Sequence, residues 1–243
     1  MCGIAVAIGL HGRPVERAAV ERMAKSLLHR GPDDGGIYVD GAVGMGFRRL
    51  SILDLSEAGH QPMISQDGQY VLVFNGEIFN YVELRDELRQ LGYQFRSSGD
   101  SEVLLAAYRE WGRDCLPKLN GMWAFVIYDR RQRRLFGSRD RFGVKPLFYS
   151  RDNTVIQFAS EIKALRASGY QRAGINWRMA SRFLLEGRLD SHHETFYEGI
   201  EQVPPGSGFE VGLDGAWHQW SFWSLDALPQ TVTTDPAAAF ADL

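Results

Sequence analysis

The sequence predicts an α+β domain in which antiparallel sheets are layered with helices. Gly3–Gly9 is a nearly continuous apolar run bounded by glycines, which is typical of a strand buried on both faces. Most later strand-like segments follow one another across short turns, as in antiparallel hairpins, while the helical segments gather in clusters. This order of elements indicates layered sheets and helices.

The N-terminal half begins with that strand and continues with a helix. Apolar residues recur at helical spacing from Pro14 to Leu28, and Pro14 and Glu16 suit the first turn. The next residues, His29–Gly36, predict a turn-rich loop. We then expect strands at Val43–Phe47 and Gln69–Phe74, and helices at Tyr81–Leu91 and Ser101–Trp111, with Asp100 as N-cap and Gly92 and Gly112 past the helix ends.

The C-terminal half is predicted to consist mainly of hairpins. Met122–Tyr128 and Arg134–Ser138 flank the charged turn Asp129–Arg133, which we interpret as a solvated loop tip and not as an RNA-binding patch. Further strands are expected at Leu147–Tyr149 and Val155–Ala159, helices at Glu161–Ala167 and Trp177–Leu185, and a closing hairpin at Phe209–Leu213 and Trp217–Phe222 around Asp214 and Gly215. Asp235–Leu243 resembles the first turns of a helix that is cut short.

Length and composition exclude several classes of protein. A chain of 243 residues predicts one large domain, or one domain with an appendage. A formal net charge of −3 gives no electrostatic reason to expect nucleic acid or a membrane surface as partner. Two cysteines are too few for a disulfide scaffold or a thiolate zinc site and suggest a reducing cytoplasm. The sequence contains no apolar run of membrane-spanning length, no metal-ligand spacing of histidines and no glycine-rich phosphate loop.

Cys2 combines two reactive groups once the initiator methionine is removed, as is usual before a small residue. Its thiol (reference pKa about 8.5) and its free α-amine (about 7.7–8.0) match well enough for the amine to accept the thiol proton. One residue then supplies both nucleophile and base. The alternative is a small buried residue that leads a strand. Cys115 has no such amine and is expected in the core or on the surface.

Asn75 and Gly76 form a second candidate constellation, after a predicted strand and before a predicted helix. A side-chain amide next to a glycine N–H can form a two-donor oxyanion hole, because glycine lets the backbone approach a substrate closely. The same dipeptide is also a common turn. These two residues alone leave both interpretations open.

Charged residues near other element ends suit an amino acid as ligand. Of the adjacent Arg48 and Arg49, one should point away, while the other can clamp a carboxylate with two parallel hydrogen bonds or form a surface ion pair. Asp100 can cap its helix or accept hydrogen bonds from a substrate ammonium. Ser97–Glu102 is only a poor match to the phosphate loop of an adenylating enzyme, because the second glycine is missing.

Taken together, these motifs closely resemble the glutaminase domain of glutamine-dependent asparagine synthetases, from residue 1 to about residue 225. Other class II glutamine amidotransferases share the N-terminal cysteine and the Asn-Gly pair, but the block that begins at Arg139 points to the asparagine synthetase type. The segments that carry the resemblance are Met1–Ile4, His29–Asp33, Arg49–Ile52, Phe74–Tyr81, Ser98–Glu102 and Arg139–Leu147.

The resemblance implies an N-terminal nucleophile hydrolase fold, a four-layer αββα sandwich of two antiparallel sheets between helices. It also implies that Cys2, freed of Met1, attacks the side-chain amide of L-glutamine, with its own amine as base. Asn75 and Gly76 would hold the oxyanion. Water would then hydrolyse the γ-glutamyl thioester to glutamate.

Four further residues receive binding roles from the same resemblance. Arg49 would bind the α-carboxylate of glutamine, and Asp100 with Glu77 its α-ammonium group. The region of Ile52 would line the pocket through backbone contacts. No metal or cofactor is expected in this chain.

The resemblance also implies a domain organisation. Residues 1–225 would form the glutaminase domain, and residues 226–243 a linker and the start of a truncated synthetase domain. That missing domain would use ATP and Mg²⁺ to activate aspartate and would receive the ammonia through a tunnel. The alternatives are an amidotransferase for another acceptor, such as a polysaccharide or peptide, and a non-catalytic scaffold. A homodimer is compatible with the sequence.

Overall fold

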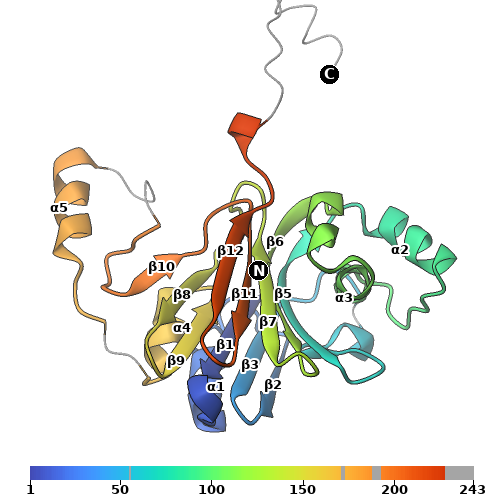
Figure 1. The fold of residues 1–243 in the computed structure, drawn as a ribbon, viewed down its shortest axis with the longest axis horizontal. Helices are drawn as coiled ribbons and strands as arrows, with labels where there is room; N and C mark the ends of the chain where they lie inside the picture. The colour runs from blue at the N-terminus through green and yellow to red at the C-terminus, as the bar shows by residue number, and fades with distance from the viewer. Residues whose placement is uncertain (55, 171–172, 188–192, 228–243) are drawn as a thin grey trace, which may run out of the picture.

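The computed structural model describes residues 1–54, 56–170, 173–187 and 193–227. It shows two antiparallel sheets of six strands each, stacked face to face with helices on their outer sides (Figure 1). In spatial order, the first sheet contains β10 (Ile200–Gln202), β8 (Phe148–Arg151), β9 (Val155–Ala159), β1 (Gly3–Gly9), β3 (Val43–Arg49) and β2 (Asp34–Asp40). The second contains β12 (Trp217–Ser221), β11 (Ser207–Gly212), β7 (Arg134–Arg139), β6 (Gly121–Asp129), β5 (Tyr70–Ile78) and β4 (Met63–Ile64).

The helices divide between the two outer faces. Side chains of α1 and α4 pack in one apolar cluster with the first sheet, and those of α2 and α3 pack in another with the second sheet. α5 lies outside the layers (Figure 1). The bounds are α1 (Arg17–Ser26), α2 (Tyr81–Gln90), α3 (Asp100–Trp111), α4 (Ile162–Ala167) and α5 (Trp177–Glu186), with 3₁₀ turns at Leu10–Gly12, Glu57–Gly59, Gly112–Lys118 and Leu225–Ala227.

Strand alternation explains why the sandwich has four layers. In β1, Ile4, Val6 and Ile8 belong to the cluster between the sheets, whereas Ala5 and Ala7 belong to the cluster under α1 and α4. Successive strand residues point to opposite faces, so a strand covered on both sides is apolar throughout. The predicted αββα arrangement of antiparallel sheets is therefore present, with β1 buried along its whole length.

Several predicted boundaries need correction. α1 begins at Arg17, three residues later than Pro14, because the N–H groups before it are used elsewhere: Val15 donates to Gly41 O (2.9 Å) and Glu16 to the Tyr170 hydroxyl (2.8 Å). The end of the predicted loop His29–Gly36 belongs to β2. A Cβ at Gly36 would overlap the Gln61 carbonyl oxygen, so its glycine reflects close packing and not a turn.

Other differences involve short elements. β4 and β10 were not predicted, because strands of two or three residues are too short to show alternation. The hairpins β6–β7 and β11–β12 are confirmed, as are the positions of Gly92 and Gly112 past the ends of α2 and α3. The helix predicted at Asp235–Leu243 lies outside the described residues.

One buried carboxylate organises the connection from β7 to β8. Asp140 accepts hydrogen bonds from the backbone N–H groups of Trp123 (3.1 Å), Phe142 (3.1 Å), Val144 (2.9 Å) and Lys145 (2.9 Å). From the preceding position, the Arg139 guanidinium donates to the carbonyls of Gly143, Lys145 and Val203, each at 2.8 Å. The loop is therefore fixed from both sides and has little freedom to rearrange.

We expect Asp140→Ala to lower the free energy of unfolding by about 3–5 kcal/mol, because it leaves several buried N–H groups without an acceptor. Urea denaturation followed by tryptophan fluorescence measures this loss. Asp86→Ala is the matched control, since Asp86 lies on the surface of α2 in an ion pair with Arg89, and we expect it to change stability by less than about 0.5 kcal/mol. Equal effects of the two substitutions would contradict this role of Asp140.

Candidate active site

A pocket opens at one end of the space between the sheets, where the inward faces of three strands change from apolar to polar. Cys2 lies two residues before Ile4 of β1, and Arg49 lies two residues after Phe47 of β3. Ile4 and Phe47 both belong to the cluster between the sheets. Since side chains two apart share a face, Cys2 and Arg49 extend the inward surface into the pocket.

β5 contributes to the pocket by the same rule. Its residues Val71 and Val73 face the first sheet, and Asn75 and Glu77 continue that face. The prediction that Asn75 follows the strand is wrong, because β5 continues to Ile78. All seven predicted site residues line this single pocket, namely Cys2, Arg49, Ile52, Asn75, Gly76, Glu77 and Asp100.

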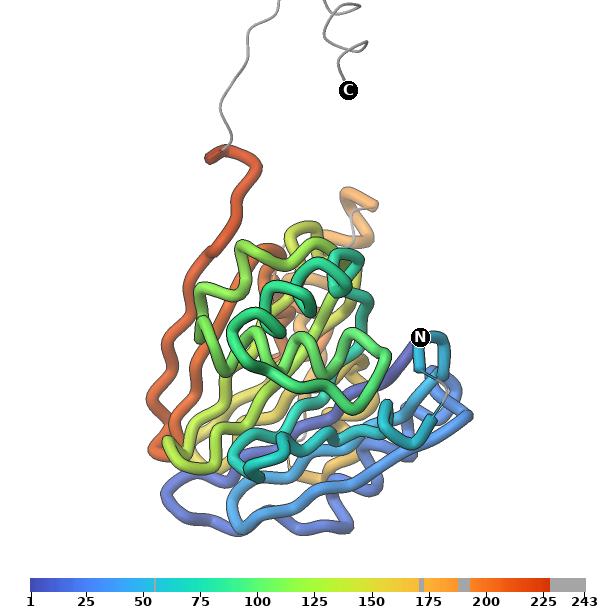
Figure 2. Tube along the Cα trace, turned by 90° about the vertical axis from the view of Figure 1, so that its right-hand side faces the viewer, coloured from blue at the N-terminus to red at the C-terminus, as the bar shows by residue number. Residues whose placement is uncertain are grey.

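Cys2 is half-buried at the start of β1, and its Sγ lies 3.6 Å from the Leu50 carbonyl oxygen. Burial raises the pKa of this thiol, while the positive charges of the N-terminus, Arg49 and Lys145 lower it in part. In Figure 2 the N-terminus lies beside the loop that follows β3, which supplies one wall of the pocket. Burial thus opposes ionisation of the thiol, while the bond to Leu50 and the neighbouring positive charges favour it.

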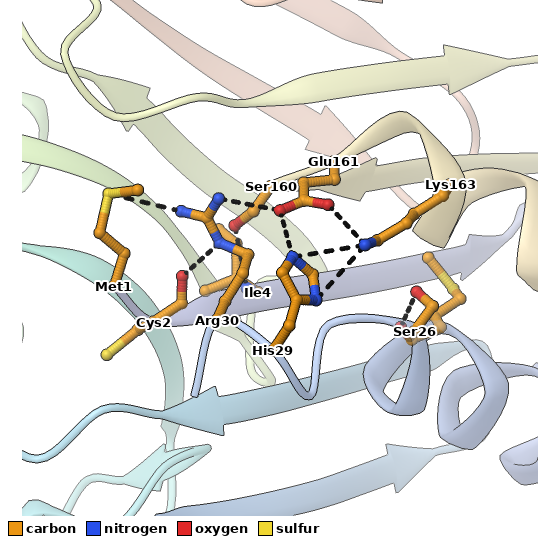
Figure 3. A network of polar contacts seen from close by, with 10 residues as sticks. Met1, Cys2, Ile4, Ser26, His29, Arg30, Ser160, Glu161 and Lys163 are labelled. Atoms are coloured by element: carbon orange, nitrogen blue, oxygen red, sulfur yellow. Dashed lines mark hydrogen bonds and ion pairs between the residues drawn. The ribbon is translucent and has the colours of Figure 1, made fainter. Parts of the chain in front are cut away.

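Arg30 holds the backbone of Cys2 in place. Its Nε donates to the Cys2 carbonyl oxygen (2.8 Å), and its other nitrogens contact Glu161 Oε1 (3.0 Å) and Met1 Sδ (3.9 Å). Figure 3 shows the Cys2 sulfur pointing away from this network. No motif in the sequence pointed to Glu161, but Arg30 stands in the motif His29–Asp33 that carried the family resemblance.

Asn75 is 1% exposed, yet neither atom of its side-chain amide has a hydrogen-bond partner among the described residues. A buried polar group without a partner destabilises a fold by about 1–3 kcal/mol, so it requires a functional or structural explanation. Because Asn75 lines the pocket that contains Cys2, its amide is placed to bind a group that enters there.

Gly76 is required by the crowding around it. A Cβ at this position would overlap Met122 O and would lie 2.6 Å from the Phe74 ring. Trp123, the partner of Gly76 in β6, exchanges hydrogen bonds with Asp140 on its other side. The Gly76 N–H therefore points away from β6, toward the edge of β5 that lines the pocket.

The Arg49 guanidinium is buried and does not form a surface ion pair. It donates to the carbonyl oxygens of Ser56 (3.1 Å) and Leu53 (3.3 Å), and also to that of Asp54. Arg48 lies on the opposite face of β3, against β2. The planar fork of Arg49 is thus directed into the loop that borders the pocket, where the acceptors among the described residues are neutral carbonyl oxygens.

Asp100 and Glu77 place two carboxylates on the same wall. Asp100 is the first residue of α3 and not its N-cap, which is Gly99, because its carboxylate accepts the N–H of Ile78 (2.9 Å). It is 5% exposed, and burial raises its pKa to about 6, with the charge of Glu77 adding to the rise. The negative charge of these two carboxylates attracts a cation, and contact with that cation can replace the water contacts that Asp100 loses on burial.

Ile52 lies at the mouth of the pocket and is 60% exposed. The loop that contains it is tied to the opposite side by Asp54, which accepts hydrogen bonds from Ser98 N (2.7 Å) and from Ser56. Bonding to Ser56 and Ser98 lowers the pKa of Asp54 to about 2. The mouth is thus bordered by two loops that are bonded to each other.

The pocket brings together a thiol, two donors at the end of β5, a guanidinium and two carboxylates. These groups can bind the carboxylate and ammonium of an amino acid and attack a carbonyl carbon between them. In the described ranges no cluster of three or more His, Cys, Asp or Glu side chains could hold a metal ion. No helix in the same ranges is long and apolar enough to cross a membrane.

Comparison with known proteins shows which family the chain resembles. The profile of the family described as glutamine amidotransferase domain matches residues 1–223. Glutamine-hydrolyzing asparagine synthetase 1 of Bacillus subtilis (strain 168) is 40% identical over 225 residues, covering 88% of this chain and 34% of that protein. Asparagine synthetase 3 of the same strain is 35% identical, covering 98% of this chain and 39% of that protein. The chain thus spans little more than a third of these relatives.

A solved structure shares the fold. The glutamine phosphoribosylpyrophosphate amidotransferase of B. subtilis matches with a TM-score of 0.69 and 20% identity, over 91% of this chain and 49% of that chain. At this identity the likeness concerns the fold alone. The predicted N-terminal nucleophile hydrolase fold is confirmed by this match and by the two antiparallel sheets.

The raised pKa of Asp100 predicts that this residue lowers the stability of the fold above a certain pH. Since the folded carboxyl keeps its proton up to about pH 6 and the unfolded one loses it near 3.8, stability falls as pH rises through this interval. We expect Asp100→Asn to raise the free energy of unfolding by about 2–3 kcal/mol at pH 7.5, and by little below pH 4. Thermal melts at both pH values measure the difference, with exposed Asp226→Asn as control. A gain that persists at low pH would contradict the assignment.

Proposed function

The chain belongs to the glutamine amidotransferase domain family, and from that membership we propose that it hydrolyses glutamine to glutamate and ammonia through Cys2. The observation that carries the proposal is the buried Asn75 amide, unpaired among the described residues, in the pocket that also contains Cys2 and Gly76. A thiol next to two oriented donors is the arrangement that acyl transfer requires.

The reaction requires removal of Met1, which leaves Cys2 with a free α-amine. That amine accepts the thiol proton, and Sγ attacks the amide carbon of the glutamine side chain. Asn75 Nδ2 and the Gly76 N–H donate to the oxyanion that forms. The ammonium group then returns the proton to the departing ammonia, which leaves a γ-glutamyl thioester. A water molecule, deprotonated by the same amine, hydrolyses the thioester and regenerates the thiol.

Two charged regions bind the ends of the substrate. The Arg49 guanidinium binds the α-carboxylate, which replaces neutral carbonyls of the adjacent loop with a charged, bidentate acceptor. Asp100 and Glu77 bind the α-ammonium group, whose charge favours their ionised forms. These contacts select an amino acid and place its side-chain amide at Cys2.

We propose further that the ammonia supports asparagine synthesis by a longer enzyme. The support is the similarity to proteins named as glutamine-hydrolyzing asparagine synthetases, of which this chain spans little more than a third. On this proposal residues 1–225 form the glutaminase domain, and residues 226–243 lead toward a synthetase domain that uses ATP and Mg²⁺. Asparagine formation from aspartate, ATP and glutamine by the full-length enzyme tests the acceptor.

Cys2→Ser should reduce glutamine hydrolysis at least about 10³-fold, because a hydroxyl is a far poorer nucleophile at the pKa of this amine. Glutamate release without ATP measures the loss, on protein whose N-terminal mass shows that Met1 is absent. Cys115→Ala is the matched control, since Cys115 is buried in the cluster under α2 and α3. Near-normal activity of Cys2→Ser would refute the mechanism, and no activity in the processed wild type would favour a non-catalytic scaffold.

Arg49→Lys should raise KM for glutamine by about 10- to 100-fold with a smaller change in kcat, because a point charge cannot reproduce the bidentate fork. Steady-state kinetics measures both parameters. The neighbouring Arg48→Lys is the control, because Arg48 lies on the other face of β3. If Arg48→Lys had the larger effect on KM, Arg49 would not be the carboxylate ligand.

A further inference from the structure

A buried lysine lies in the wall of the active-site pocket and has no part in the mechanism above. Lys145 is 8% exposed and lines the same pocket as Cys2. Its backbone N–H and carbonyl are bonded to Asp140 and Arg139, respectively. Within the described part of the chain, its ammonium group makes no ion pair and no hydrogen bond. The charge is therefore available to the pocket.

The surrounding loop fixes the backbone that carries this ammonium group. Asp140 and Arg139 bond to the backbone on both sides of Lys145. Leu147, two residues further on, is buried in the core between the sheets. The fold thus places the positive charge of Lys145 in the wall of the pocket.

We propose that the Lys145 ammonium group stabilises the thiolate form of Cys2. The inference rests on the proposed function in one respect, that Cys2 reacts as a thiolate. The step is a proton transfer alone: the thiol proton moves to the α-amine, and the sulfur retains the electron pair and a negative charge. Lys145 acts on the nucleophile through its charge and does not need to touch the substrate.

The other charges around Cys2 show why this one is needed. Arg49 on β3 becomes neutralised when it binds the substrate carboxylate, and Arg30 is already paired with Glu161. Across the pocket, Glu77 on β5 and Asp100 on α3 add negative charge that opposes thiolate formation. Burial raises the pKa of the Cys2 thiol, and Lys145 is one of the groups that lower it. With substrate bound, two positive groups remain beside the thiolate: the α-ammonium group of Cys2 itself, formed by the proton transfer, and the Lys145 side chain in the pocket wall.

The test measures thiolate formation directly and needs no glutamine. Protein without Met1 is alkylated with iodoacetamide between pH 5 and 10, and the rate at the N-terminal peptide is followed by mass spectrometry, which separates Cys2 from buried Cys115. We expect Lys145→Met to move the midpoint of this profile about one pH unit upward, because an opposite charge near the thiolate is lost. Lys145→Arg keeps the charge and should leave the midpoint within about 0.3 unit of the wild type.

Controls separate charge from structure. Lys145→Gln is the second neutral variant, for use where methionine lowers the yield of folded protein, and circular dichroism checks each fold. Lys118→Met removes a lysine that pairs with Glu87 on the surface and should leave the midpoint unchanged. An unchanged midpoint in a folded neutral variant, or an equal shift in Lys145→Arg, overturns the inference. Absence of glutamine hydrolysis with a Lys145-dependent midpoint would refute the proposed function alone.

Discussion

The packing of two apolar sheet faces against each other is the interaction on which the rest of this structure depends. It requires β1, β3 and β5 to direct alternate side chains inward, and those residues form the core between the sheets. At one end the same inward positions carry Cys2, Arg49 and Asn75. The candidate active site is therefore the continuation of the core, built by the same alternation with polar side chains in place of apolar ones.

The sequence was informative where the signal is local. Apolar periodicity and turn residues predicted β1, the hairpins and the clustered helices, and the seven site residues predicted from short motifs all line the one pocket. It was not informative where one segment determines the conformation of a distant one. The local sequence predicts Asp100 as a helix cap, whereas its carboxylate bonds to the N–H of Ile78, which belongs to β5. The ion pair of Arg30 with Glu161 joins residues far apart in the chain. Likewise, nothing local indicated that loop carbonyls surround Arg49.

Two neighbouring regions differ in how fully their buried polar groups are hydrogen-bonded. In the connection from β7 to β8, Asp140 and Arg139 are surrounded by hydrogen-bond partners, and the loop is rigid as a result. In the pocket, the Asn75 amide lacks a partner among the described residues and Asp100 has a raised pKa. In the pocket, contacts with a ligand can restore the stability that these two residues give up.

The backbone hydrogen bonds on both edges of β1 restrict errors in the register of this strand. β1 is paired with β3 on one edge and with β9 on the other, so its register is set twice. A shift of the β1 register by one residue would turn Cys2 toward the helices, and the inward-facing core residues of β1 would turn with it. Cys2, the proposed nucleophile, therefore either faces the pocket or faces the helices, and the two rows of backbone hydrogen bonds along β1 exclude positions in between.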